Sequence, residues 1–187
     1  ASSAGGAGSA QAKPLTEEAL HAAIKQKNFS YTGLGEFQLS PEGRLTAAGL
    51  AQTGVADLSP LAGQPLVALD IRATLVEDLS PLEGMPLEEL VAASTKVGNL
   101  APLAGMPMKF LDLLETKVGD LSPLKGMPLE ILLLDDTRVA DLSPLEGMKL
   151  TNLRLNSAPV KSIAALRGMP LVEINLFGTQ VSDLSPL

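Results

Sequence analysis

The chain has 187 residues, of which 45% are hydrophobic and only 3% aromatic, so its core must be built mainly from small aliphatic side chains. It contains no cysteine, which excludes disulfides, a cysteine-ligated zinc site and a thiol nucleophile. A net charge of −7 opposes binding to nucleic acid, and no apolar run reaches the roughly 18 to 20 residues needed for membrane insertion.

Residues 1–13 consist mainly of Ala, Gly and Ser. Such a segment buries too little apolar surface to offset the entropy of ordering, which predicts a flexible linker or tail. The first residues lack an initiator Met and the basic region of a signal peptide, so the start is interpreted as a processed or excised end. The sequence is compatible with both a cytoplasmic and a secreted or periplasmic protein.

The stretch 15–28 has the pattern of an amphipathic helix. Leu20, Ala23 and Ile24 share one face, and Thr16 stands where an N-cap is expected. Glutamates in the first turn and lysines near the end suit the helix dipole. We therefore predict one helix before the rest of the fold.

A β-hairpin is expected after this helix. Phe37 and Leu39 alternate with polar residues before a Pro-Glu-Gly turn, and a second strand begins at Leu45. Helix and hairpin together make residues 14–44 an N-terminal cap for the segment that follows.

Residues 45–187 repeat with a period of 21 residues. The most regular column is valine, at Val55, Val76, Val97, Val118, Val139, Val160 and Val181. The consensus is LxxLxLxxTxVxDLSPLxGMP, and the final copy is incomplete. Alternation in LxxLxLxx predicts one short strand per copy, and SPLxG predicts one 3₁₀ turn with Ser as its cap and Gly at its end.

A chain that returns to the same point after each repeat stacks its strands in parallel, about 4.8 Å apart. The predicted fold is therefore an α/β solenoid, with about seven short strands on a concave face and 3₁₀ turns on the convex face. The sequence stops at Leu187 within a convex segment, so we expect that the chain was cut there or that another chain covers its last coil.

This pattern resembles the leucine-rich-repeat family. The stretch TxVxDLSPL, as in residues 74–82, is most similar to the short bacterial repeats of the internalin type. The motif DLSPLxGMPL is also similar to repeat arrays in planctomycete-like bacteria, where such repeats often accompany signalling kinases or other large modules. One departure is threonine where the family commonly has asparagine, at Thr53, Thr74, Thr95, Thr116, Thr137 and Thr179, with Ala158 in the remaining copy.

No pattern indicates catalysis, a cofactor or a metal site. His21 is the single histidine and lies on the predicted helix, far in sequence from any triad partner. An acidic column could suggest calcium, but Asn99 and Ser162 replace it in two copies, which favours a role in capping turns. That column is Asp57, Asp78, Asp120, Asp141 and Asp183. We expect a protein that is not an enzyme.

Two further columns have structural interpretations. The threonine hydroxyls are expected to bond the loop backbone that leaves each strand, and their loss at Ala158, beside Pro159, predicts a local irregularity. A methionine column suits an adaptable binding stripe, but its fixed position in the repeat favours core filling. These methionines are Met85, Met106, Met127, Met148 and Met169.

Alternate side chains of each predicted strand face outward, where they can vary without disturbing the core. Phe110, Leu114, Ile131 and Leu133 fall on two adjacent strands, with Val91 one strand away. An apolar centre with a charged rim on such a surface predicts a protein-binding patch. The residues expected to bind the partner are Val91, Phe110, Asp112, Leu114, Ile131, Leu133, Asp135, Arg154 and Phe177.

The sequence therefore predicts a protein–protein interaction module that binds a macromolecular partner on its concave face. Two alternatives stay open: a regulatory or spacer segment of a larger, kinase-like enzyme, and a solenoid that self-associates through its open C-terminal coil. The apolar residues could also serve the protein itself, by contacting its other regions or by strengthening the sheet.

Overall fold

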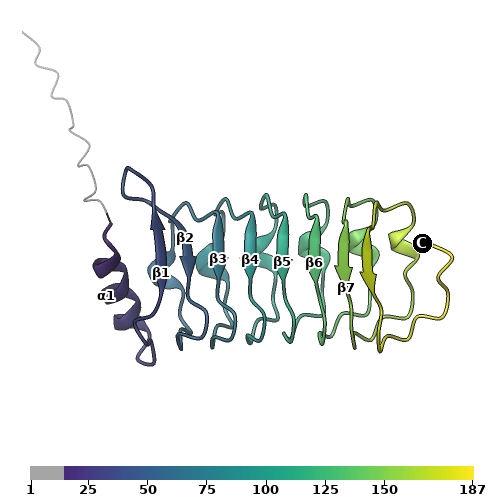
Figure 1. The fold of residues 1–187 in the computed structure, drawn as a ribbon, viewed down its shortest axis with the longest axis horizontal. Coiled ribbons are helices and arrows are strands. Elements are labelled where there is room, and N and C mark those ends of the chain that lie inside the picture. The colour runs from purple at the N-terminus through teal and green to yellow at the C-terminus, as the bar shows by residue number, and fades with distance from the viewer. Residues whose placement is uncertain (1–14) are drawn as a thin grey trace, which may run out of the picture.

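The computed structural model describes residues 15–187 (Figure 1). The tail predicted for residues 1–13 lies outside the described residues. One helix, α1 (Glu17–Lys27), precedes the strands. The strands are β1 (Glu36–Leu39), β2 (Leu45–Gly49), β3 (Ala68–Asp70), β4 (Glu89–Val91), β5 (Phe110–Asp112), β6 (Ile131–Leu133), β7 (Asn152–Arg154) and β8 (Glu173–Asn175). The 3₁₀ turns between them are η1 (Ser59–Leu61), η2 (Ser80–Leu82), η3 (Ala101–Leu103), η4 (Ser122–Leu124), η5 (Ser143–Leu145) and η6 (Ala164–Leu166).

Helix α1 follows the predicted start and stop chemistry. The Thr16 hydroxyl accepts a hydrogen bond from the Ala19 N–H at 3.2 Å, which satisfies one of the free donors of the first turn. Leu20 and Ile24 are buried on the predicted apolar face. The helix prediction is confirmed.

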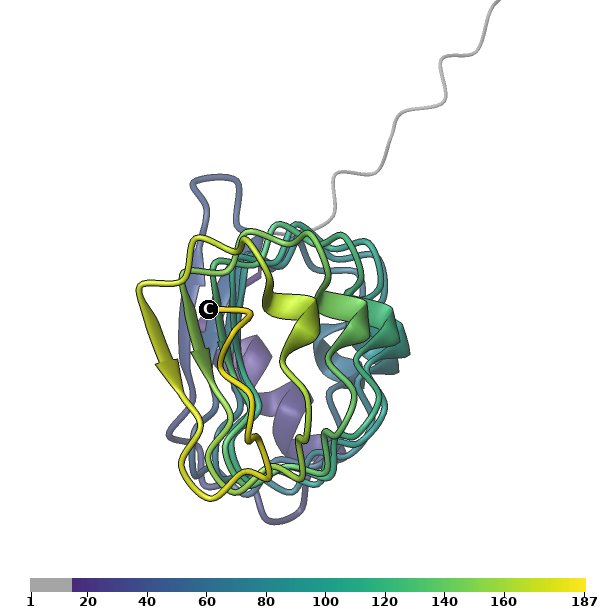
Figure 2. The same cartoon turned by 90° about the vertical axis from the view of Figure 1, so that its right-hand side faces the viewer.

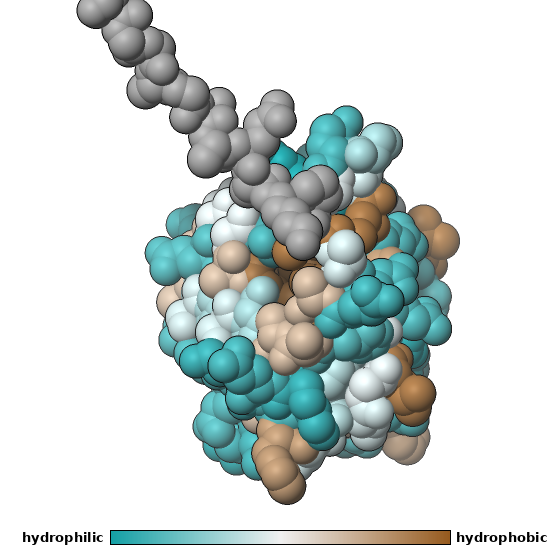
Figure 3. All heavy atoms as spheres, turned by 90° about the vertical axis from the view of Figure 1, so that its left-hand side faces the viewer, coloured by the Kyte–Doolittle hydropathy of each residue, from teal (hydrophilic) through white to brown (hydrophobic). Residues whose placement is uncertain are grey.

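The expected hairpin is also present. Strands β1 and β2 pair antiparallel, with Phe37 opposite Ala48. Tyr31 and Phe37 join Leu20 and Ile24 of α1 in the core cluster that continues into the first coil. Seen from this end, the molecule is mostly hydrophilic or neutral, with scattered hydrophobic residues (Figure 3). A polar outer face is what the end of a solenoid needs.

Asn28 fastens the helix to the first coil. Its side-chain amide donates to the Ile24 and Asp57 carbonyls at 3.1 and 2.9 Å. Its side-chain oxygen accepts from the N–H groups of Ala56 and Asp57 at 2.7 and 2.8 Å. Asn28 is only 4% exposed, so these bonds satisfy both of its polar atoms inside the protein.

Over residues 15–187 the strands form one eight-stranded sheet in chain order. Strands β2 to β8 pair in parallel, and β1 adds the antiparallel edge. Viewed along the solenoid, the sheet forms one side and the 3₁₀ turns the other (Figure 2). The predicted parallel sheet and the predicted turns are therefore confirmed.

The repeated columns fill the space between these two sides. Leucines and valines of the central coils are almost fully buried, as Leu111 and Val118 show at 0% exposure. Core filling by methionine is confirmed in four copies, where Met85, Met106, Met127 and Met148 are 4–5% exposed. Met169 is only partly buried, and it follows η6, the last 3₁₀ turn of the described array.

The threonine column bonds as predicted. In each copy that has it, the hydroxyl donates to the carbonyl three residues earlier, as from Thr116 to Leu113 at 2.7 Å. The residue just before this column, including the copy with Ala158, has a left-handed backbone, which turns the chain sharply out of the strand. Those residues are Gln52, Ala73, Ser94, Glu115, Asp136 and Ser157, with φ of 53–59°, and Gly178, with φ of 72°.

One local prediction is wrong, and another holds for the hydrogen bonds but not for the backbone angle. Serine does not cap the 3₁₀ turns: Ser122 is the first residue of η4, and its N–H donates to Asp120 Oδ1 at 2.8 Å. The irregularity expected at Ala158 is absent from the backbone angle, because Ser157 keeps φ at 59°. What is missing there is one inter-coil hydrogen bond of the ladder, since Pro159 has no N–H to donate.

Candidate functional site

The sheet face is the outer surface formed by alternate side chains of β2 to β8. The register places equivalent residues of successive coils side by side. One row holds Ala47, Ala68, Glu89, Phe110, Ile131, Asn152 and Glu173, and the next holds Gly49, Asp70, Val91, Asp112, Leu133, Arg154 and Asn175. Residues between these rows, such as Leu111 and Leu132, point inward and are 0% exposed.

Large apolar side chains gather on β4, β5 and β6. We call them the apolar patch: Val91, Phe110, Leu114, Ile131 and Leu133, each partly exposed. Phe110 lies directly opposite Ile131 on the neighbouring strand. A hollow of about 460 Å³ opens over this part of the sheet, lined by Glu89, Val91, Lys109, Phe110, Glu130 and Ile131. The structure thus brings together the five apolar residues expected from the sequence.

Asp112 occupies the centre of the apolar patch. On the neighbouring strands it lies between Val91 and Leu133. Along the chain, the period of two puts Phe110 on the same side of β5, and Leu114 follows in the turn just after the strand. The carboxylate accepts one hydrogen bond, from the Leu114 N–H at 3.0 Å. A charged group therefore stands among apolar side chains on all four sides.

This position changes the ionisation of Asp112. Burial raises the pKa of the Asp112 carboxyl, more than the Leu114 hydrogen bond and the charges of Arg154 and Arg72 lower it. Neither arginine forms a salt bridge with Asp112 among the described residues. The carboxylate is thus poorly solvated and lacks an ionic partner of its own.

Two ion pairs flank this centre. Arg72 Nε donates to Asp70 Oδ2 at 2.8 Å, and Arg154 Nη2 lies 2.6 Å from Asp135 Oδ2. We expected Asp135 on the exposed rim, yet it is 2% exposed. The contact with Arg154 and the Asn156 N–H, which donates to Asp135 Oδ1 at 2.8 Å, offset part of the cost of burying this carboxylate.

The pair of Asp135 and Arg154 is imperfectly satisfied. Their contact lacks hydrogen-bond geometry, so Asp135 Oδ2 has no hydrogen-bond partner within residues 15–187. Arg154 Nε and Asn156 Oδ1 are likewise buried without a partner in that part of the chain. Buried polar atoms of this kind are uncommon in folded proteins. They adjoin the apolar patch, because Leu133 lies opposite Arg154.

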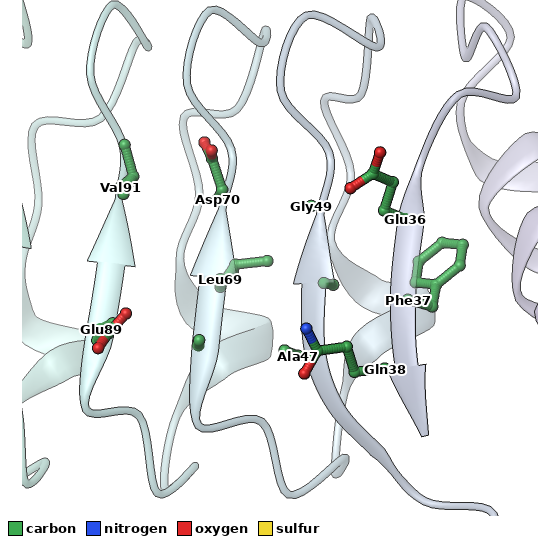
Figure 4. Close-up of a pocket in the computed structure, with 11 residues that line it drawn as sticks. Glu36, Phe37, Gln38, Ala47, Gly49, Leu69, Asp70, Glu89 and Val91 are labelled. Atoms are coloured by element: carbon green, nitrogen blue, oxygen red, sulfur yellow. The ribbon is translucent and has the colours of Figure 1, made fainter. Parts of the chain in front are cut away.

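Sequence reasoning missed a second hollow, at the N-terminal end of the sheet face (Figure 4). Small side chains at Ala47, Gly49 and Ala68 leave a space of about 440 Å³. Glu36 of β1 and Glu89 of β4 stand on opposite sides of it. The run of Ala and Gly at outward positions of neighbouring copies was the signal that could have revealed this hollow.

Phe177 does not join the apolar patch. It follows β8, three coils beyond Leu114, and is 80% exposed. Other exposed apolar residues of the last coils are Val172, Leu184 and Leu187, at 86%, 58% and 58%. Phe177 therefore belongs to a separate apolar region.

Groups that could support catalysis or metal binding have structural partners. His21 Nδ1 lies 2.7 Å from the buried Tyr31 hydroxyl, and the His21 ring packs edge-on against Phe37. Within residues 15–187, no group of three or more His, Cys, Asp or Glu side chains could hold a metal ion. The acidic column caps turns as predicted, and the Ser122 hydrogen bonds lower the pKa of Asp120.

Comparisons with known proteins identify the fold. The structure matches an internalin, inlF, from Listeria monocytogenes, with a TM-score of 0.71 and 22% sequence identity over 91% of this chain and 51% of that chain. It also matches internalin C2 (inlC2) from Listeria monocytogenes, with a TM-score of 0.64 and 25% identity over 90% of this chain and 87% of that chain. The chain is a leucine-rich-repeat solenoid. No protein-family model and no curated protein matches the sequence.

This leucine-rich-repeat solenoid spans about half the length of the inlF chain. The fold is thus shared. The described helix α1 is too short to cross a membrane.

Proposed function

We propose that this leucine-rich-repeat solenoid is a non-enzymatic protein-interaction module that binds a protein partner on its sheet face. One observation carries the proposal. The apolar patch places five large apolar side chains on the outside of the sheet, where the fold requires none. Charged residues surround it, including Glu89 and Arg154. An apolar centre with a polar rim is the usual composition of a protein-binding surface.

The scaffold suits this role. Parallel coils hold the outward side chains at fixed positions, so a partner does not have to order the surface when it binds. Phe110 and its neighbour Ile131 have the size and central position of residues that dominate binding energy. The fold shared with the internalins supports the proposal without naming a partner.

The test compares two double variants of the described chain. Phe110→Ser with Leu133→Ser removes the centre of the apolar patch. Val67→Ser with Leu75→Ser is the matched control, because these apolar residues are 40% and 48% exposed but lie outside the strands. After circular dichroism shows that all chains fold, each is used to capture proteins from lysate and envelope fractions of the source organism.

We expect a protein that is retained by the wild type and by the control but lost from the Phe110→Ser, Leu133→Ser variant. Loss of two central side chains should weaken binding by about 30-fold or more, since each central residue typically contributes more than about 1 kcal/mol. Identical captured proteins for all three chains would contradict the proposed site.

Self-association is a second candidate, favoured by a separate observation. Val172 and Phe177 are 86% and 80% exposed, and both lie next to β8, whose outer edge has no neighbouring strand in the described sheet. Exposed apolar residues beside an unpaired edge favour association between copies. Light scattering over a range of protein concentrations should then show growing particles, whereas a constant monomer mass would exclude this function.

A further inference from the structure

We infer that the partner docks a cationic segment on the sheet face, with an Arg or Lys side chain that meets Asp112 and apolar side chains that cover the patch around it. This inference rests on the proposed function and adds the chemistry of the partner. The geometry that carries it is the position of one carboxylate between Val91, Leu133, Phe110 and Leu114.

Covering the apolar patch also covers Asp112. Any partner that buries Phe110, Ile131 and Leu133 removes the remaining water from a carboxylate that lies among them. A buried carboxylate with only one donor, the Leu114 N–H, and no salt bridge within the described residues would offset much of the gain from the apolar contacts. The partner must therefore bring a group that donates hydrogen bonds, and a cation satisfies the charge as well.

The chain itself does not supply this cation. The closest basic residues, Arg72 and Arg154, are paired with Asp70 and Asp135 on the same face. At the edges of the sheet, Lys109 pairs with Glu88 at 2.6 Å. Turning an arginine toward Asp112 would leave its present partner alone, most severely the buried Asp135. A cation from another molecule is therefore the remaining source.

The N-terminal part of the sheet face also carries negative charge. Glu36 and Glu89 flank the hollow over Ala47 and Ala68 (Figure 4), and neither forms a salt bridge within residues 15–187. That hollow adjoins the apolar patch, because Val91 lines the hollow and belongs to the patch. A segment with further basic residues toward the N-terminal end of the solenoid would meet these carboxylates.

Other partner chemistries fit less well. A purely apolar segment would leave Asp112 unpaired, and an acidic segment would face Asp112 and Glu89 with like charge. The net charge of −7 also steers basic partners toward the chain and acidic ones away. Charge complementarity thus selects one class of occupant.

The experiment uses a phage-displayed library of random linear peptides as the probe. The library is panned on the wild-type chain, and the retained peptides are sequenced and synthesised. We expect them to carry Lys or Arg next to large apolar residues. Their affinity is then measured for the wild type, Asp112→Asn and Asp120→Asn. The last is the matched control, because Asp120 is an exposed turn cap outside the sheet face.

Asp112→Asn should weaken binding about tenfold or more, because close charge pairs in interfaces couple by about 1.5 kcal/mol or more, while Asp120→Asn should leave affinity unchanged. Replacing the peptide's basic residue by Met should weaken its binding to the wild type by a similar factor. The same replacement should change its binding to Asp112→Asn little. Peptides that lack basic residues, or that bind Asp112→Asn as well as the wild type, would overturn the inference, as would a library from which none is retained.

The same peptides separate the two proposals. If they bind the Phe110→Ser, Leu133→Ser variant as well as the wild type, they do not use the apolar patch, and the proposed site is wrong. If they lose affinity for that variant but show no dependence on Asp112, the proposed site stands and only the cationic partner is refuted.

Discussion

At the scale of single residues, Asp112 is the position where the stability of the fold and the proposed binding function have opposite requirements. A carboxylate among four apolar neighbours is poorly solvated, and burial raises its pKa. Such a residue lowers the stability of the folded chain when no partner is bound. Proteins tend to break the rules of stable packing at the sites they use for function.

Asp112→Asn should therefore stabilise the free protein at neutral pH. Because the pKa of Asp112 is higher in the folded chain than in the unfolded chain, the folded state loses stability as pH rises through these two values. The gain from Asn should be largest at neutral pH and should vanish below the ordinary carboxyl pKa of 3.8. Urea unfolding at several pH values measures this difference.

Asp120→Asn provides the control of opposite sign. The Ser122 hydrogen bonds lower the pKa of Asp120, so its carboxylate contributes stability that is present at neutral pH and lost as pH falls. This variant should lose stability at neutral pH. Equal effects from both substitutions would show that the surroundings of Asp112 are not as described.

Ala73 offers a second test at this scale. Its φ of 53° is a left-handed conformation that costs an L-residue about 1–2 kcal/mol, whereas glycine adopts it freely. After allowing for the flexibility of glycine in the unfolded chain, Ala73→Gly should stabilise the protein by about 0.5–1 kcal/mol. Gly178, with φ of 72°, occupies the equivalent position of a later coil. Denaturation should show that Gly178→Ala has the opposite sign, and a loss of stability in both variants would contradict this account.

At the scale of elements, the N-terminal cap depends on one side chain. Asn28 joins the end of α1 to the first coil through four hydrogen bonds to the backbone of Ile24, Ala56 and Asp57. Its amide can do so because it carries both donors and acceptors. The helix covers the first coil, so this link protects the core beneath it.

Asn28→Ala should destabilise the protein by about 2–4 kcal/mol, because it leaves buried backbone groups unpaired. Hydrogen exchange should also quicken in α1 and in the first coil. Asn99→Ala is the control: Asn99 is exposed and accepts one bond, from the Ala101 N–H at 2.9 Å, so its loss should cost about 1 kcal/mol. Similar losses for the two variants would refute a special role for Asn28.

The elements themselves could be predicted because their signals are local. The period of 21 residues fixes the strand register, so the sequence alone predicts that Phe110 lies beside Ile131. Side-chain contacts between residues far apart in the sequence were harder to predict. Nothing in the sequence near Asn28 shows that it bonds Asp57, and the burial of Asp135 depends on how Arg154 turns on the next coil.

The left-handed backbone angles at residues other than glycine could not be predicted from the sequence either. Glycine marks a left-handed position clearly, but Gln52, Ala73 and Ser94 adopt this conformation without it. The stacking of coils imposes the angle, against the preference of the residue. The central place of Asp112 could have been predicted from the rows of outward residues, where it falls between Val91 and Leu133.

At the scale of the whole molecule, a regular solenoid carries an irregular surface. Inward columns barely change from coil to coil, so each coil packs on the next in the same way. Variation is greater at outward positions of the sheet face, where large apolar residues are concentrated over β4 to β6. The apolar residues of the last coils are more exposed, so local opening should be easiest there.

Photo-crosslinking at Phe110 tests the central claim most directly. Phe110 is replaced by a benzophenone-bearing phenylalanine, and the same replacement at Phe29, which is 94% exposed on the cap, is the control. On illumination in the organism's extract, we predict a protein adduct from position 110 that is absent from position 29 and lost when Leu133→Ser is added. No adduct at position 110, or the same adducts from both positions, would contradict binding at the apolar patch.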